Sequence, residues 1–172
     1  FRDSTGEIQL DHEIEYYDGS ASGGDVILSD GWYTGTGTYN VTAGSDRLLV
    51  LVTGLEDASG QPTITNVTFG GVSMTPAAQR SIGTTPFHRS EIWYLKDADI
   101  PTGDNSFVVT YSPSDPGRKL HAYVLFTNVN QINPIVDFES GTMYGDTVST
   151  DNSFSVGAGG RSVSGAVSNT VG

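Results

Sequence analysis

Two clusters of acidic residues have a spacing that could bind a metal ion. They are Asp97, Asp99 and Asp104, in a predicted turn, and Asp11, Glu13 and Glu15, in a predicted strand. Alternate residues of a strand share one face about 7 Å apart, where carboxylates repel one another unless a cation or a basic group lies beside them. Calcium takes roughly six to eight oxygen ligands. We therefore predict a structural Ca²⁺ ion, but the first cluster lacks EF-hand spacing and is also explained by a solvated turn.

Trp32 and Tyr33 are the aromatic pair best placed to bind a sugar. They lie in a glycine-rich stretch that predicts a loop, where their rings would be exposed. An exposed tryptophan or tyrosine offers an apolar ring together with a polar group. The alternative is that both rings close over the core. The pair is our candidate ligand-binding site for glycans.

No sequence motif predicts catalysis. His12, His88 and His121 each fall in a predicted strand, where we interpret histidine as a core or surface residue rather than a catalyst or metal ligand. A serine–histidine–aspartate arrangement can form in any chain order, but no G-x-S-x-G sequence supports one. We therefore predict that the protein is not an enzyme and has no catalytic residue, with a secreted hydrolase as the last alternative.

The hydrophobic pattern predicts strands rather than helices. Residues 7–17 (EIQLDHEIEYY) alternate in character, which is typical of a strand with one buried face. Residues 47–53 (RLLVLVT) and 120–127 (LHAYVLFT) are apolar without alternation, which indicates central strands covered on both sides. Gly70 and Gly71 predict a tight hairpin turn. The predicted fold is an all-β antiparallel sandwich of jelly-roll or immunoglobulin-like kind.

The chain changes character near its C-terminal end. We predict a β-sandwich core over residues 1–138, including the N-terminal strand, and a glycine- and serine-rich segment over residues 139–172. That segment has three interpretations: terminal strands, a linker, or a donor strand that pairs with a neighbouring molecule.

Composition excludes several kinds of partner. The chain has 172 residues, no cysteine and a net charge of −12, from 20 acidic and 8 basic residues. Nucleic acid requires clustered Lys and Arg against its phosphates, so we predict no such partner. No apolar run approaches the roughly 20 residues that span a bilayer, so we predict no membrane insertion. The first residue, Phe1, is interpreted as the result of signal-peptide removal, which predicts a secreted, extracellular or cell-surface protein.

Four stretches occur in an order that resembles a known module. They are residues 67–75 (VTFGGVSMT), 91–95 (EIWYL), 100–106 (IPTGDNS) and 124–134 (VLFTNVNQINP). This order is similar to a β-sandwich repeat module of large secreted and cell-surface proteins of bacteria and archaea, and the similarity extends back to residues 43–50. The resemblance implies a fold and an extracellular setting, and it implies no catalytic activity.

Together these features predict an extracellular structural or adhesive module. We expect a subunit or repeat of a surface filament, tubule or adhesin, which pairs with copies of itself through strand exchange or edge pairing. The first alternative is a carbohydrate-binding module of a secreted protein.

Overall fold

The described strands form three antiparallel sheets. The computed structural model describes residues 10–11, 26–58, 60–83, 87–113, 115–140, 147–156 and 161–170. Its strands are β1 (Leu10–Asp11), β2 (Ile27–Leu28), β3 (Tyr33–Thr34), β4 (Thr38–Val41), β5 (Leu48–Asp57), β6 (Thr63–Phe69), β7 (Val72–Ser73), β8 (Thr75–Ile82), β9 (Phe87–Lys96), β10 (Gly103–Ser112), β11 (Arg118–Thr127), β12 (Ile135–Ser140), β13 (Thr147–Val156) and β14 (Arg161–Thr170). Within these ranges the helical structure is one 3-10 turn, Asp97–Asp99. The predicted all-β antiparallel sandwich is confirmed.

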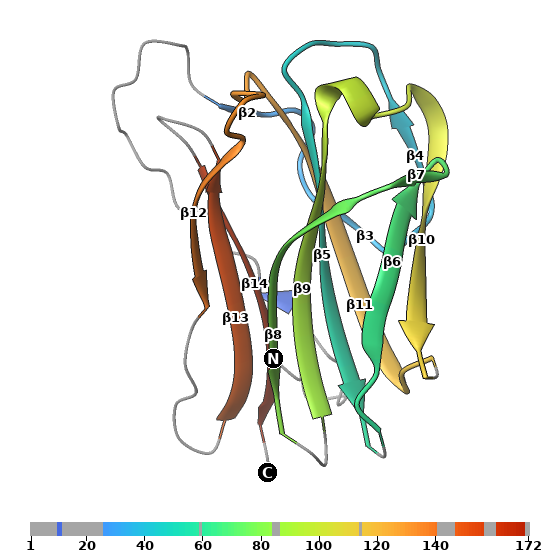
Figure 1. The fold of residues 1–172 in the computed structure, drawn as a ribbon, viewed down its shortest axis with the longest axis vertical. Coiled ribbons are helices and arrows are strands. Elements are labelled where there is room, and N and C mark those ends of the chain that lie inside the picture. The colour runs from blue at the N-terminus through green and yellow to red at the C-terminus, as the bar shows by residue number, and fades with distance from the viewer. Residues whose placement is uncertain are drawn as a thin grey trace.

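A central sheet separates the two hydrophobic cores. Its order is β2-β11-β5-β9-β8, and β3 also pairs with β11. A smaller sheet, β4-β10-β6-β7, covers one face, and the sheet β1-β14-β13-β12 lies against the other through contacts with β5, β8 and β9. Figure 1 shows these three layers side by side, with the central sheet in the middle.

Strand β5 is buried along its whole length because both of its faces are covered. Its side chains alternate between the cores, with Leu49, Leu51 and Leu55 in the first core and Leu48, Val50 and Val52 in the second. Strand β11 behaves in the same way, since Tyr123 and Leu125 face the first core and Val124 and Phe126 face the second. The prediction of two central strands covered on both sides is therefore confirmed.

The first core is closed by aromatic rings of the smaller sheet. The ring centroids of Phe69 and Phe107 lie 4.7 Å apart, and Phe107 lies 4.8 Å from Tyr123 of the central sheet. Offset aromatic pairs at such distances add to the gain from burial. Trp93 of β9 is buried in the same cluster.

The chain passes between the two sheets at both of their sides. After β7 pairs with β6, the chain continues through Met74 into β8, which pairs with β9 of the central sheet. On the other side, β3 pairs with β11 and the next strand, β4, pairs with β10. These crossings join the two sheets over only part of their length, because β7 and β4 are short.

The terminal segments contribute backbone to the third sheet. Leu10 and Asp11 form β1 and pair with β14, and the other residues of the predicted strand 7–17 lie outside the described part of the chain. Within residues 139–172, the described backbone forms the end of β12 together with β13 and β14, which pair as a hairpin. The division of the chain at residue 138 stays a prediction.

The predicted hairpin turn at Gly70 and Gly71 is confirmed. Both glycines have positive φ angles, 57° and 84°, which other residues adopt at a cost. A Cβ atom on Gly70 would overlap the side-chain oxygen of Asn105 and lie 2.7 Å from Pro101 Cγ, whereas a Cβ atom on Gly71 would meet nothing within 4 Å. Asn105 in turn holds the neighbouring turn, because its Nδ2 donates to the carbonyls of Thr102 and Gly103 at 3.1 Å.

We expect Gly70→Ala to destabilise the protein more than Gly71→Ala. Both substitutions strain a positive φ, at about 1–2 kcal/mol, but only the first also displaces Asn105, for which overpacking adds about 1–3 kcal/mol. Urea denaturation of the two variants and the wild type measures the difference. Equal losses of unfolding free energy would show that the contact between the two turns does not constrain the fold.

Candidate functional site

Trp32 and Tyr33, the predicted glycan-binding pair, point to different parts of the molecule. Trp32 is half-buried and packs against the second core. Tyr33 is 37% exposed, and its ring stacks on Tyr123 with centroids 5.4 Å apart and planes at 14°. Successive residues of an extended chain face opposite sides, so the two rings do not form one flat platform.

Tyr33 belongs to a cluster of three tyrosines beside Asp30. The Tyr39 ring lies 5.2 Å from that of Tyr33 and 5.1 Å from that of Tyr123. The Tyr33 hydroxyl donates to Asp30 Oδ2 at 3.1 Å, and the Tyr39 hydroxyl donates to the same oxygen at 3.0 Å. The hydrogen bond to Asp30 raises the pKa of Tyr33, and burial raises that of Tyr39. Both phenols therefore stay protonated and orient the carboxylate.

This tyrosine cluster can recognise one sugar ring. The exposed ring of Tyr33 offers an apolar surface, and Asp30 places acceptor oxygens next to it that can bind hydroxyl groups. Its residues come from the segment before β3 and from β3, β4 and β11. The chain thus presents one exposed aromatic ring beside a carboxylate here, and Trp32, the other residue of the predicted pair, is not part of this cluster.

The acidic residues of the first predicted metal cluster have different partners. Asp97 accepts from Arg47 Nε at 2.5 Å, and Asp104 accepts from Asn40 Nδ2 at 2.6 Å. Asp99 is exposed at the end of the 3-10 turn. Asp11 lies in β1, and Glu13 and Glu15 are outside the described residues. Across the described ranges, no group of three His, Cys, Asp or Glu side chains is arranged to hold a metal ion, so the Ca²⁺ site stays a prediction.

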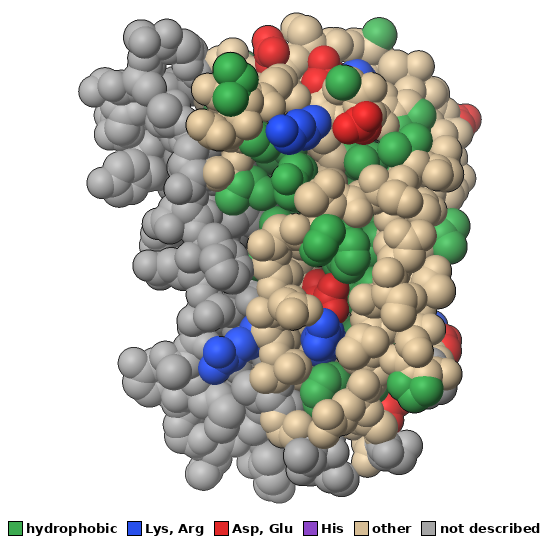
Figure 2. All heavy atoms as spheres, viewed as in Figure 1, with side chains coloured by type: hydrophobic (Ala, Val, Ile, Leu, Met, Phe, Trp, Pro, Cys, Tyr) green, Lys and Arg blue, Asp and Glu red, His purple; other side chains and the backbone are tan. Residues whose placement is uncertain are grey.

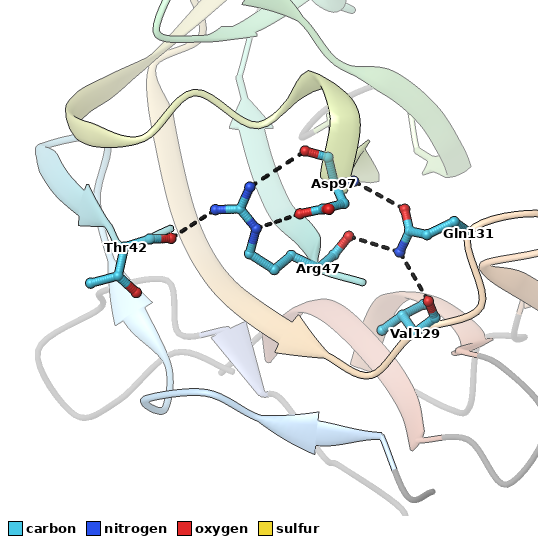
Figure 3. A network of polar contacts seen from close by, with 5 residues as sticks. All are labelled: Thr42, Arg47, Asp97, Val129 and Gln131. Carbon is cyan, nitrogen blue, oxygen red and sulfur yellow. Dashed lines mark hydrogen bonds and ion pairs between the residues drawn. The ribbon is translucent and has the colours of Figure 1, made fainter. Parts of the chain in front are cut away.

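Asp97 takes part in a buried network around Arg47, shown in Figure 3. Arg47 is 6% exposed, and its Nη1 donates to the Thr42 carbonyl at 2.7 Å. Gln131 Nε2 donates to the carbonyls of Arg47 at 3.1 Å and Val129 at 2.9 Å, and its Oε1 accepts from the Asp97 amide at 3.0 Å. A buried charge needs such partners, because removing one side of the pair costs about 3–5 kcal/mol. The network ties the start of β5 to the segments after β9 and β11.

Glu91 is a buried acid that the sequence analysis did not single out. It is 2% exposed, and its Oε2 accepts from Trp93 Nε1 at 2.9 Å. Burial raises the pKa of Glu91, while the adjacent Arg89 guanidinium and the Ile64 backbone amide oppose that rise. Glu91 is the first residue of the stretch EIWYL, where an acid directly before an apolar run was the available signal.

His121 bridges the central and smaller sheets. It is 7% exposed, and its Nε2 lies 3.0 Å from the Tyr111 hydroxyl on β10. Burial, assisted by the charge of Lys119, lowers the pKa of His121 to about 4, so the imidazole is neutral at pH 7. Lys119 Nζ also lies 5.2 Å from the Tyr111 ring centroid. The register places Thr53 of β5 between His121 and Glu91, so the acid and the imidazole sit two strand spacings apart, about 10 Å.

Comparison of the whole chain with family models, curated proteins and solved structures gave no match. The class of the protein is defined by its fold alone, which is an all-β antiparallel sandwich. The motif resemblance stays a prediction. In the described part of the chain, none of the helical structure is long and apolar enough to cross a membrane.

We expect the protein to lose stability below pH 6.5 through His121. The unfolded chain takes up a proton near pH 6.5, whereas the folded imidazole does so only near its pKa of about 4. The stabilising contribution of the neutral imidazole is complete above pH 6.5 and is lost as the pH falls toward 4, so that the accumulated loss is about 2–3 kcal/mol at pH 4.5. His121→Gln keeps a partner for Tyr111 but does not titrate there.

The measurement is urea denaturation of wild type and His121→Gln from pH 7.5 to 4.5. The unfolding free energy of the wild type should fall by about 2–3 kcal/mol more than that of the variant. Taking the difference between the two proteins cancels every other titrating group, including Glu91. Parallel pH profiles would contradict the expected burial of a neutral imidazole.

Proposed function

We propose that the chain is an extracellular structural or adhesive module, a subunit or repeat of a surface filament, tubule or adhesin. It joins copies of itself by pairing strand edges. The observation that carries this proposal is that, within the described residues, this side of β10 pairs with β4 over residues 103–106 and no further, although β10 continues to Ser112. An unpaired strand edge is a template for another strand, and main-chain hydrogen bonds along it can hold modules together.

The buried polar residues support a structural role. Arg47, Asp97 and Gln131 connect separate segments of the chain, and His121 and Glu91 bond to groups of the smaller sheet. These polar groups hold the two sheets together. Contacts of this kind suit a structural repeat in a long surface protein.

We expect the purified chain to assemble in millimolar Ca²⁺. Negative-stain microscopy with Ca²⁺, and then with a chelator, tests assembly and the predicted Ca²⁺ site in one experiment. Ordered assemblies that dissolve with chelator would support both. Assemblies that persist would support edge pairing without calcium. Separate, monomeric particles under both conditions, also in sedimentation at high protein concentration, would contradict the proposal.

Carbohydrate binding is the second candidate function, favoured by the tyrosine cluster. Tyr33 is exposed on one side and stacked on Tyr123 on the other, and Asp30 is fixed beside it by two phenol hydroxyls. A ring that is already ordered loses little freedom when a sugar stacks on it.

If the chain binds a glycan, Tyr33→Ala should weaken the binding roughly tenfold, because it removes the stacking surface. A glycan array identifies the ligand, and calorimetry measures its affinity for both proteins. Ile132→Ala is the control, since Ile132 is another exposed apolar residue, 83% exposed, and it lies in the segment after β11, outside the tyrosine cluster. An equal effect of both substitutions, or no bound glycan on the array, would argue against this function.

A further inference from the structure

The backbone of β10 leaves three residues facing an unpaired edge. The carbonyls of Ser106, Thr110 and Ser112 all point to β6, since they accept from Gly70 N, Thr65 Oγ1 and Thr63 Oγ1. Alternate residues of an antiparallel strand direct their N–H and C=O groups to opposite sides. Those of Phe107, Val109 and Tyr111 therefore point away from β6, and no strand in the described part of the chain pairs with them.

The opposite edge of the same sheet is satisfied differently. On β6, the Val67 carbonyl accepts from Met74 N at 2.8 Å, and the Ile64 amide is bound by the Glu91 side chain. The chain thus supplies a crossing segment and a buried carboxylate on the β6 side. On the β10 side, the segment that could continue the ladder, β4, begins at Thr38 opposite Ser106. Figure 1 shows β10 at the outer margin of the fold.

The open stretch lacks the charged residues and prolines that usually prevent edge pairing, although its pairing with β6 is irregular between Thr110 and Tyr111. Such edges are commonly protected by lysine, proline or a bulge on the strand. Residues 105–112 (NSFVVTYS) contain no charged residue and no proline, although the chain has a net charge of −12. Val108 on the outer face is 59% exposed. Figure 2 shows mainly uncharged polar and backbone atoms over the part of the surface where β6 and β10 lie. A second copy of the chain would therefore meet little charge repulsion here.

We infer that β10 pairs antiparallel with β10 of a second copy, about a two-fold axis at Val109. This inference rests on the proposed function and names its contact. The edge-facing groups of Phe107 would bond to those of Tyr111 in the other copy, and Val109 would pair with its own counterpart. In this register Ser112 of each copy falls opposite Ser106 of the other, which already pairs with Thr38 of β4, so the contact runs from Phe107 to Tyr111 and each strand must leave the joined sheet after Tyr111.

The register makes a specific pair on the exposed outer face. Val108 of one copy lies directly opposite Thr110 of the other, in a pair without mutual hydrogen bonds. The Cα atoms of such pairs are about 4.5 Å apart, which is within the range of about 4.4–6.8 Å that a disulfide spans. Two copies of Val108, or two of Thr110, are not opposite each other. The chain contains no cysteine, so introduced thiols are the sole thiols.

The experiment is mild oxidation of the full chain carrying Val108→Cys and Thr110→Cys together, followed by a non-reducing gel. Most of the double variant should become a covalent dimer. Each single variant alone should stay monomeric, and an equal mixture of the two single variants should cross-link again. Both positions are exposed, so the fold should be retained, which circular dichroism checks.

Any one of four outcomes would overturn the inference. A double variant that stays monomeric after oxidation, or a single variant that dimerises as well as the double variant, excludes this register. A photo-crosslinker on Val108→Cys identifies the neighbour by mass spectrometry: a link near Thr110 supports the inference, and a link to another stretch, such as residues 7–17, overturns it. Sedimentation of the wild type separates the two proposals. If the wild type assembles while the double variant fails to cross-link, the β10 contact is wrong and the proposed function stands. If the wild type is monomeric, both the β10 contact and the proposed function are wrong.

Discussion

The buried ion pair between Arg47 and Asp97 fixes how the central strands meet. A guanidinium that is 6% exposed needs a full set of acceptors, and the acceptors come from segments far apart in the sequence. The pair can form only when β5 begins beside the end of β9. Gln131 then extends the network to the segment after β11, so the three long strands are aligned at one end by hydrogen bonds with defined directions. The hydrophobic cores supply most of the free energy, but apolar packing alone does not fix this alignment.

Two-sided burial of β5 and β11 determines the layered architecture. Since both faces of these strands are apolar, one covering sheet would leave the second core in water. The sheet that contains β13 and β14 lies on that second face, which connects the C-terminal part of the chain to the stability of the centre. The smaller sheet covers the other face, and His121 and Glu91 make polar contacts with it.

The features that the sequence could predict are those set by local pattern. Uninterrupted apolar runs predicted β5 and β11, and adjacent glycines predicted the turn at Gly70. Strand β8 was not predicted, because Thr75–Ile82 has no apolar alternation and is a strand only through its pairing with β9. The remaining features depend on which residues lie close together in the folded chain, and the sequence pattern does not show this. The spacing of Asp97 from other acidic residues predicted a metal ligand, but its carboxylate accepts a hydrogen bond from Arg47, which lies fifty residues earlier in the chain. Trp32 and Tyr33 are neighbours in the sequence, yet they pack on different cores.

Pairing through β10 has a limit that follows from its symmetry. A two-fold contact uses the same edge in both copies and is then closed, so it makes a pair of modules and cannot by itself extend a filament. Within the described part of the central sheet, β8 is an edge strand. It carries Pro76, which lacks an amide proton, and a bulge between Pro76 and Ala78, and both features hinder the addition of another strand. Growth of a filament therefore requires a contact of a different kind. In a longer protein with several such modules, paired β10 edges would cross-link neighbouring chains side by side, and the covalent chain would supply the length.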